Sequence, residues 1–468
     1  MLKVIFATLI GVFIAISGII ILYWRDSKFE PTAQDLILYL GFTPLVIGLI
    51  LLIPYFAVKW YQYNKTKKLE SEQVVNQNEQ IQLNDQQEVE YFSLNVLSTS
   101  LYHAFGRDHD VFNQIIQLPG PDLDEVLENN FGNRVLSYRI KEIESIENNS
   151  EYEMLAPLQM RMNQLIFDQL QENASVISKI AEHLKQSAIF YDSQLAYEYR
   201  MHPAWINPHL DINETEEDAI PVQVPRLNSL NLHIVLADAL LHIWDEVSCT
   251  EQLEQYMLQQ GIIPQQIKVE YHYWGAENAY SKWINLLQEI HQQEAEVSLF
   301  MITDSEIDQE RLDDRFWFAE KYIPAEFAGV CCLSSPTTEV LGLERLKKVD
   351  IVLHEVSLSN TLQEKNINAL PQFMQDHPFV VIPDDISKST LSNQIEQKFS
   401  ATPIKAYHYL YSQSSLGHTQ HLSKLFGFLL GLHASEELHS LVYSIELPQT
   451  TVIFSPVVDE ALSEPRDL

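Results

Sequence analysis

The sequence predicts an α/β protein in which two N-terminal transmembrane helices precede a layered body. Two long apolar runs lie within the first 58 residues, and strand-like and helix-like segments alternate from residue 91 to 456. Hydrophobic residues make up 46% of the 468, which is enough for a folded core. The chain has 30 Lys and Arg against 64 Asp and Glu, a formal net charge of −34. A surface this acidic repels phosphate backbones, so the composition argues against a nucleic-acid partner.

The two apolar runs are residues 4–24 and 36–58, and each is as long as the roughly 20 residues with which a helix crosses a bilayer. A signal peptide would be shorter and would end at a small-residue cleavage site. The sequence therefore predicts a transmembrane hairpin over residues 1–68. Four lysines and no acidic residue lie between residues 59 and 68, directly after the second run. Because positively charged flanks stay on the cytoplasmic side, both termini are expected in the cytoplasm, and the short loop between the two runs is expected outside.

The remaining chain divides by composition. Residues 69–90 are rich in Gln, Asn and acids and predict a polar tether. A globular body is expected over 91–456, with two halves at 91–220 and 221–456, because three prolines and an acidic run mark 207–225. Residues 457–468 are expected to form a tail. Three cysteines, two of them adjacent, suggest no disulfide framework.

Apolar periodicity predicts the elements of the body. Helices are expected over 158–184, 251–259, 279–291 and 422–432. A strand that turns into a helix is expected over 232–244. Strands are expected over 267–273, 297–302, 328–333, 349–356, 379–382 and 404–410, and a closing pair over 441–447 and 451–454. This alternation predicts a sheet that helices cover on both faces.

Common catalytic motifs are missing from the sequence. It contains no phosphate-binding GxxxxGK[ST], no GxSxG, no HExxH and no CxxC. His433, Glu437 and His439 include a spacing that could place two metal ligands on one helical face, but an exposed polar face after an apolar helix is the favoured interpretation. No cofactor is predicted.

Short segments of the body resemble β-ketoacyl synthases of the thiolase fold. Residues 415–419 read Ser-Leu-Gly-His-Thr, similar to the sequence around the second catalytic histidine of that family, and 251–269 and 311–333 resemble family segments in the same order. The resemblance implies a thiolase-like body, a homodimer and a catalytic role for His418. It also implies a nucleophilic cysteine at a strand–helix junction, but residues 273–277 there read Tyr-Trp-Gly-Ala-Glu. Residues 379–385 stand where the family has its first histidine, and they contain none. We therefore expect the fold without its chemistry, a pseudoenzyme.

The overall layout resembles the type VI lipase adaptor proteins of Gram-negative bacteria. This resemblance implies an inner-membrane protein with a short periplasmic loop, whose body binds a phospholipase effector and delivers it to the type VI secretion spike. Exposed aromatic residues would then form the client interface, and the candidates are Trp205, Trp274 and Trp317.

Two alternatives stay open. One is a membrane-localised acyl-transfer or lipid-processing enzyme of the thiolase fold that uses His418. The other is a scaffold that docks envelope complexes without a soluble client.

Overall fold

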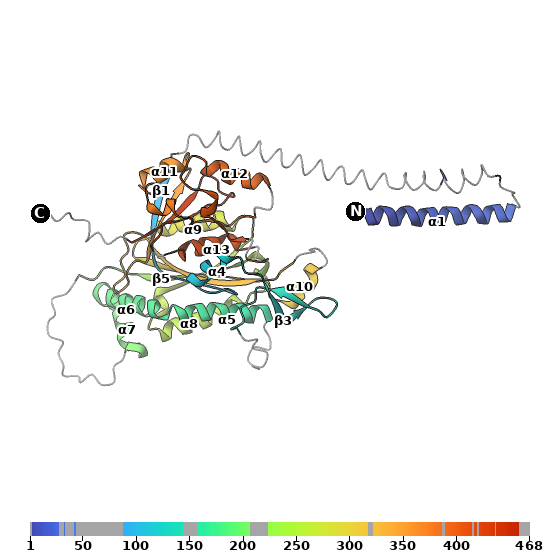
Figure 1. The fold of residues 1–468 in the computed structure, drawn as a ribbon. Coiled ribbons are helices and arrows are strands. Elements are labelled where there is room, and N and C mark those ends of the chain that lie inside the picture. Colours follow the sequence, from blue (N-terminus) through green and yellow to red (C-terminus); the bar gives the residue numbers. More distant parts are fainter. Residues whose placement is uncertain are drawn as a thin grey trace. The chain divides into compact units, whose positions relative to one another are not determined.

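The computed structural model describes residues 2–27, 32, 42–43, 88–143, 157–205, 223–316, 322–385, 389–413, 416–418, 421–435 and 437–457. The chain divides into two units, Met1–Gln87 and Glu88–Leu468. In the first unit, helix α1 spans Leu2–Ser27. The second unit is the body, and it contains the strands and the remaining helices discussed below (Figure 1).

The predicted pair of transmembrane helices is corrected by this structure. Residues 4–24, the first expected span, fall within α1. Among the described residues, no helix has both the length and the apolar character that a membrane crossing requires. Of the second expected span, 36–58, only residues 42–43 are described, and the expected tether lies outside the described residues up to residue 87.

The body begins with a segment that alternates strands and helices up to residue 334. Its elements are β1 (Glu90–His103), β2 (Gly106–Arg107), α4 (His109–Gln117), β3 (Asp122–Glu128), β4 (Arg134–Ser137), α5 (Pro157–Glu172), α6 (Ala174–Tyr191), α7 (Ser193–Met201), η2 (Pro203–Trp205), β5 (Ser229–Ala237), η3 (Asp238–Leu240), α8 (Glu246–Gln259), η4 (Pro264–Gln266), β6 (Ile267–Trp274), α9 (Ala279–His291), β7 (Glu296–Ser305), α10 (Gln309–Phe316) and β8 (Glu326–Ser334).

A second, shorter segment completes the body. Its elements are β9 (Lys347–Leu353), α11 (Leu358–Glu364), η5 (Pro371–Met374), β10 (Val380–Ile382), α12 (Ser389–Phe399), η6 (Ala406–His408), β11 (Tyr409–Tyr411), α13 (Ser423–Leu432), β12 (Ser440–Val442) and β13 (Thr451–Pro456).

The strand order reveals an internal duplication. The main sheet runs β11-β10-β12-β13-β9-β1-β8-β7-β5-β6. Followed from its outer edge, the first half of the sheet runs β6-β5-β7-β8-β1, and the second half runs β11-β10-β12-β13-β9. If the strands of each half are numbered along the chain, both halves have the same order: third, second, fourth, fifth, first. In both sets the second strand is parallel to the third and fourth, and the fifth is antiparallel to the fourth and first. The repeat divides the body between β8 and β9, whereas the sequence placed a division near residue 220.

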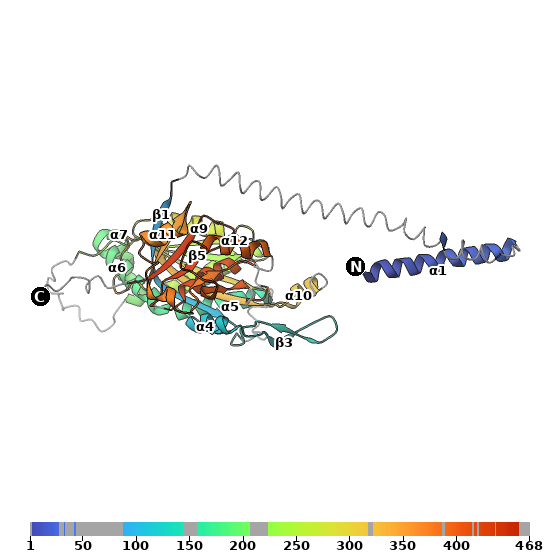
Figure 2. The same ribbon diagram turned by 45° about the horizontal axis from the view of Figure 1, so that its top comes forward.

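Helices separate the two half-sheets and cover their outer faces. On β5, Leu230, Leu232, Ile234 and Leu236 point into one core beside α5, α6 and α8, whereas Val235 points into another that contains α9 and α13. A third core joins α11 and α12 to the second half-sheet. Figure 1 shows α9 and α13 in the middle of the body, with α5, α6 and α8 on one side and α11 and α12 on the other. In the turned view of Figure 2, α9, α11 and α12 lie toward the top and α4 and β3 toward the bottom. The layered α/β body that the sequence predicts is therefore confirmed.

The helix after the third strand occupies the same place in both halves. α9 follows β6 and α13 follows β11, and the two helices contact each other between the half-sheets. Phe428 of α13 packs edge-on against Trp283 of α9 with ring centroids 5.1 Å apart. The segments that lead into these two helices therefore form corresponding positions in the duplicated fold.

Candidate functional site

His418 lies in the described segment 416–418, which leads toward α13. Its backbone N–H donates to the carbonyl of Ile323 at 2.9 Å, and its Nδ1 accepts the N–H of Ile323 at 2.8 Å. Gly417 has φ +68°, and a Cβ there would lie 2.8 Å from the Cβ of Ala325 and 2.9 Å from the carbonyl oxygen of Ile323. These contacts hold the His418 ring in one orientation through its Nδ1, which lies 2.8 Å from the nitrogen and 2.9 Å from the oxygen of Ile323.

The junction between β6 and α9 contains no nucleophilic side chain. Residues 275–277 are Gly, Ala and Glu, and a carboxylate fills the space beside them. A Cβ at Gly275 would lie 2.5 Å from Oδ2 of Asp238, which begins η3. The other oxygen of Asp238 lies 3.0 Å from Nδ1 of His421, in the segment before α13. Asp238 and His421 are therefore in contact between the two corresponding junctions, although Nδ1 of His421 makes no hydrogen bond among the described residues.

Two buried carboxylates at the end of β7 lie close to this pair. Asp304 is 1% exposed, and its Oδ2 accepts the N–H of Leu422 at 3.2 Å, just before α13. Burial raises the pKa of Asp304 to about 6, the neighbouring Glu306 adds to this rise, and His421 opposes it. Glu306 is paired with Arg315 at 3.2 Å and accepts the O–H of Tyr322 at 2.8 Å.

None of these groups is a thiol. Burial raises the pKa of Cys249, Cys331 and Cys332, so all three described thiols stay protonated at neutral pH. The two adjacent cysteines lie within β8 and are fully buried. The cluster of Asp238, His421 and Asp304 therefore lacks the partner that acyl transfer through a thioester requires.

The structure does not bring the three candidate metal ligands together. α13 ends at Leu432, so His433 and the residues described after it do not continue the helix that would have placed His433 and Glu437 on one face. Nε2 of His433 lies 3.0 Å from Oγ1 of Thr99, and burial lowers its pKa to about 3. His439 lies 3.1 Å from Oγ of Ser455 instead, and Glu437 is exposed.

The three candidate interface tryptophans have different environments. Trp274 is only 4% exposed and packs against Trp283, so its indole is not available to a partner. Trp205 is half-buried, and its Nε1 donates to the carbonyl of Gly261 at 2.8 Å. Trp317 lies outside the described residues.

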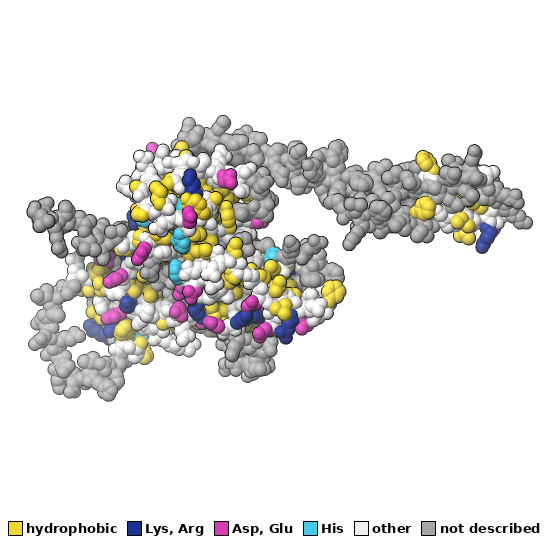
Figure 3. All heavy atoms as spheres, in the orientation of Figure 1, with side chains coloured by type: hydrophobic (Ala, Val, Ile, Leu, Met, Phe, Trp, Pro, Cys, Tyr) yellow, Lys and Arg dark blue, Asp and Glu magenta, His cyan; other side chains and the backbone are white. Residues whose placement is uncertain are grey.

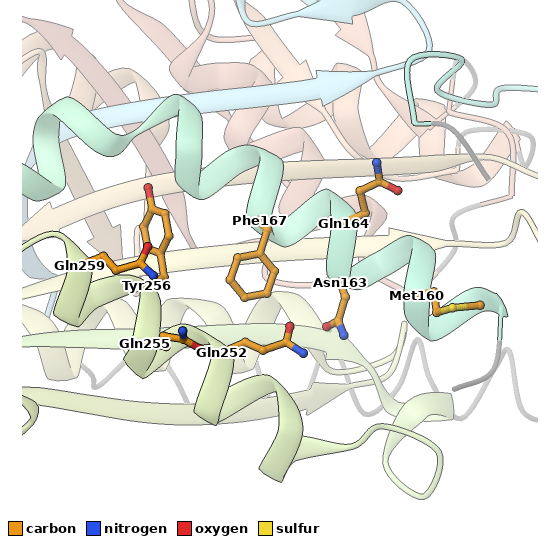
Figure 4. A pocket seen from close by; sticks show the side chains of 8 residues that line it. All are labelled: Met160, Asn163, Gln164, Phe167, Gln252, Gln255, Tyr256 and Gln259. Carbon is orange, nitrogen blue, oxygen red and sulfur yellow. The ribbon is translucent and has the colours of Figure 1, made fainter. Parts of the chain in front are cut away.

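A groove between α5 and α8 is the main feature that the sequence analysis did not identify. It has a volume of about 430 Å³. Figure 4 shows its side chains, which come from these two helices: Met160, Asn163, Gln164, Phe167, Gln252, Gln255, Tyr256 and Gln259. Phe167 and Tyr256 meet edge to face with centroids 6.4 Å apart. The hydroxyl of Tyr256 donates to the carbonyl of Leu170, so its ring position is fixed.

Five of the eight lining side chains are amides, and none of the described lining residues is charged. Each amide offers both a donor and an acceptor, as a peptide backbone does. The amide oxygen of Asn163 is buried and has no hydrogen-bond partner among the described residues. The sequence does carry a signal for this groove, because Gln252, Gln255 and Gln259 are spaced at i, i+3 and i+7, which places them on one face of a helix.

Charged groups lie elsewhere on the body. Figure 3 shows Asp and Glu side chains interspersed with Lys and Arg on one face. The large negative charge of the chain is therefore not gathered into one acidic patch on this face.

No family model and no curated protein matches the chain. Among solved structures, it is similar to the ketosynthase from module 1 of the bacillaene synthase of Bacillus amyloliquefaciens FZB42, with 12% identity, a TM-score of 0.43, and coverage of 80% of this chain and 74% of that one. The ketosynthase from module 6 of the bacillaene synthase of Bacillus subtilis 168 has 10% identity and a TM-score of 0.43, and the match covers 78% of this chain and 72% of that one. Human mitochondrial 3-ketoacyl-CoA thiolase has 11% identity and a TM-score of 0.30, and the match covers 50% of this chain and 88% of that one.

These solved structures are of the ketosynthase and thiolase type that the sequence predicts for the body. All of the TM-scores lie below 0.5, so the likeness carries no argument about chemistry, and the description of the fold rests on its own strand order. The resemblance to type VI lipase adaptors has no support in these comparisons.

Proposed function

We propose that the body is a non-catalytic adaptor that binds a segment of a protein client in the groove between α5 and α8. The observation that carries this proposal is the lining of the groove, five amide side chains beside two aromatic rings and no charged group. Such a lining can hydrogen-bond to a peptide backbone and pack against an apolar side chain. It contains no acid, base or nucleophile suited to chemistry at neutral pH.

The region around His418 supports the same proposal. His418 is the one synthase histidine that the sequence matches, and the junction at residues 275–277 provides no thiol or hydroxyl for it to activate. The competing function, acyl transfer, needs a nucleophile beside a base and an oxyanion site. The Asp238–His421 pair supplies at most the base.

A phospholipase effector of a type VI secretion system is the client that we propose, on the resemblance of the large acidic α/β body alone to that of its adaptors. Delivery to the secretion spike would follow from this binding. A homodimer is compatible with the proposal and is not needed for it.

Binding of a purified type VI phospholipase to the full-length protein, measured by isothermal titration calorimetry, tests the proposal. Gln255 is exposed on α8 and lines the groove, so Gln255→Trp should fill it and weaken binding at least about tenfold. Gln171 is a matched control, because it is exposed on α5 and does not line the groove. Gln171→Trp should leave the affinity within about twofold of the wild type.

Three results would contradict the proposal: no binding by the wild-type protein, equal losses in the two variants, or no loss in Gln255→Trp. An acyl-thioester turnover assay addresses the competing function directly. The wild-type protein should show no turnover. Turnover that disappears in His421→Ala, without a change in unfolding midpoint, would favour the enzyme.

A further inference from the structure

Three potential metal ligands converge on the neighbouring strands β5 and β6. The two strands are parallel, and their register places His233 of β5 opposite Glu270 of β6. Side chains two residues apart on a strand point to the same face, so His272 lies on the same side of β6 as Glu270. These residues belong neither to the groove nor to the cluster around Asp304.

The ligand atoms have the spacing of a small cation site. Nδ1 of His233 lies 3.0 Å from Nε2 of His272 and 3.5 Å from Oε2 of Glu270, and the last two atoms are 3.9 Å apart. Zinc binds imidazole nitrogen and carboxylate oxygen at about 2.0–2.2 Å, which in a tetrahedral site separates neighbouring ligand atoms by about 3.4 Å. The observed separation of 3.0 Å is shorter than this value, and those of 3.5 and 3.9 Å are longer.

The surroundings hold the two imidazoles in place. His233 is 2% exposed and stacks on Phe300, with ring centroids 4.6 Å apart and an angle of 14° between the planes. Its Nε2 is buried and has no hydrogen-bond partner among the described residues, so no such bond fixes the tautomer of the ring. Burial lowers the pKa of His233 to about 3 and that of His272 to about 4, which leaves both rings neutral at neutral pH.

The carboxylate supplies the charge and the access. The side chain of Glu270 is 55% exposed, so the cluster opens to solvent on one side. Among the described residues, these three form the one group of His, Cys, Asp or Glu side chains whose ligand atoms lie close enough together to share a metal ion.

We propose that His233, Glu270 and His272 bind a divalent zinc ion, with at least one coordination position open to solvent. Two imidazoles and one carboxylate form a ligand set that zinc uses when it keeps such an open position. A hydrogen bond between the two imidazoles would also give a short nitrogen–nitrogen distance. A zinc site predicts that zinc binds and that Glu270 contributes to its affinity, whereas a hydrogen bond between the imidazoles predicts neither.

Zinc titration of the full-length protein after chelator treatment, by isothermal titration calorimetry, tests this proposal. The wild-type protein should bind one zinc ion per chain, and zinc should raise its unfolding midpoint. His272→Ala and Glu270→Gln each remove a ligand at a partly exposed position and should weaken this binding, the former at least about 100-fold. His242→Ala removes an exposed histidine outside the cluster and should leave the affinity unchanged.

The unfolding midpoint without zinc shows whether each variant is folded. If His272→Ala proves unstable, Glu270→Gln alone decides, because Glu270 has no role in the core. No zinc binding by the wild-type protein would overturn the proposal. If both variants bind zinc with the affinity of the wild type, the metal lies elsewhere and the proposal is also overturned.

Discussion

Asp304 offers a direct test of how the body tolerates a buried carboxylate at the start of α13. Asp304→Asn removes the charge but leaves an oxygen that can still accept the N–H of Leu422. The pKa of this carboxyl rises from 3.8 to about 6 on folding, first through burial and then through Glu306. At about 1.4 kcal/mol per pH unit, the ionised carboxylate costs the folded state about 3 kcal/mol at neutral pH.

The sign of the pH dependence follows from the raised pKa. Between about pH 4 and pH 6 the folded protein keeps a proton that the unfolded chain has lost, so the stability of the wild type falls as the pH rises. Urea unfolding of the wild type and Asp304→Asn, monitored by circular dichroism, measures this difference. The variant should be more stable by about 3 kcal/mol at about pH 7, and by less than about 1 kcal/mol at about pH 4.

Asp124 provides a control of opposite sign. Burial raises its pKa, but hydrogen bonds from Arg139, Leu127 and Ser137 outweigh burial and lower the pKa to about 2. Asp124→Asn should therefore destabilise the body at neutral pH by about 2 kcal/mol, with a loss that fades as the pH falls toward 2. An Asp304→Asn variant that is less stable than the wild type at neutral pH would refute the reasoning, as would a stability gain that does not change with pH.

Two further substitutions test other parts of the body. Arg161 donates to buried Glu326 at 2.6 and 2.7 Å, so Arg161→Met should cost about 3–5 kcal/mol of unfolding free energy, and Arg161→Met with Glu326→Gln should recover part of it, as urea unfolding can measure. A double variant no more stable than Arg161→Met would contradict the idea that the unpaired charge is the cause. Gly261 has φ +92°, and a Cβ there would lie 2.7 Å from the ring of Trp205. Gly261→Ala should cost at least about 1–2 kcal/mol in thermal unfolding, and an unchanged midpoint would contradict this.

The sequence predicts those elements whose apolar pattern is strong and local. The expected strand over 297–302 lies within β7, the helix over 279–291 coincides with α9, and the expected closing pair appears as β12 and β13. In contrast, β1 was not predicted, because it includes Asn95, Thr99 and Ser100, whose side chains find their hydrogen-bond partners only in distant parts of the chain. Ser100 of β1, for example, donates to Gln169 of α5.

The candidate sites were harder to predict because each depends on contacts between elements. The spacing of His433 and Glu437 suggested a shared helical face, but the helix ends one residue before His433. The His233–Glu270–His272 cluster requires the parallel register of β5 and β6, which no local pattern determines. The groove between α5 and α8 could be predicted in part. Its amides show helical spacing in the sequence, but only the packing of α5 beside α8 shows that they face a common space.

The central place of β1 has a consequence for the synthesis of the protein. Among the described strands, β1 is the first to be made, and beyond its short hairpin with β2 it pairs with β8 and β9; Asn95 donates to the carbonyl of Ser335, which is 240 residues further along the chain. At roughly 5–20 residues per second, a ribosome takes roughly 10–50 s to make that interval. During this time the two-residue strand β2 covers only the end of β1, and the rest of β1 can pair with the exposed strand edges of other chains. The yield of folded protein therefore depends on how well the cell shields its first strand until its partners emerge.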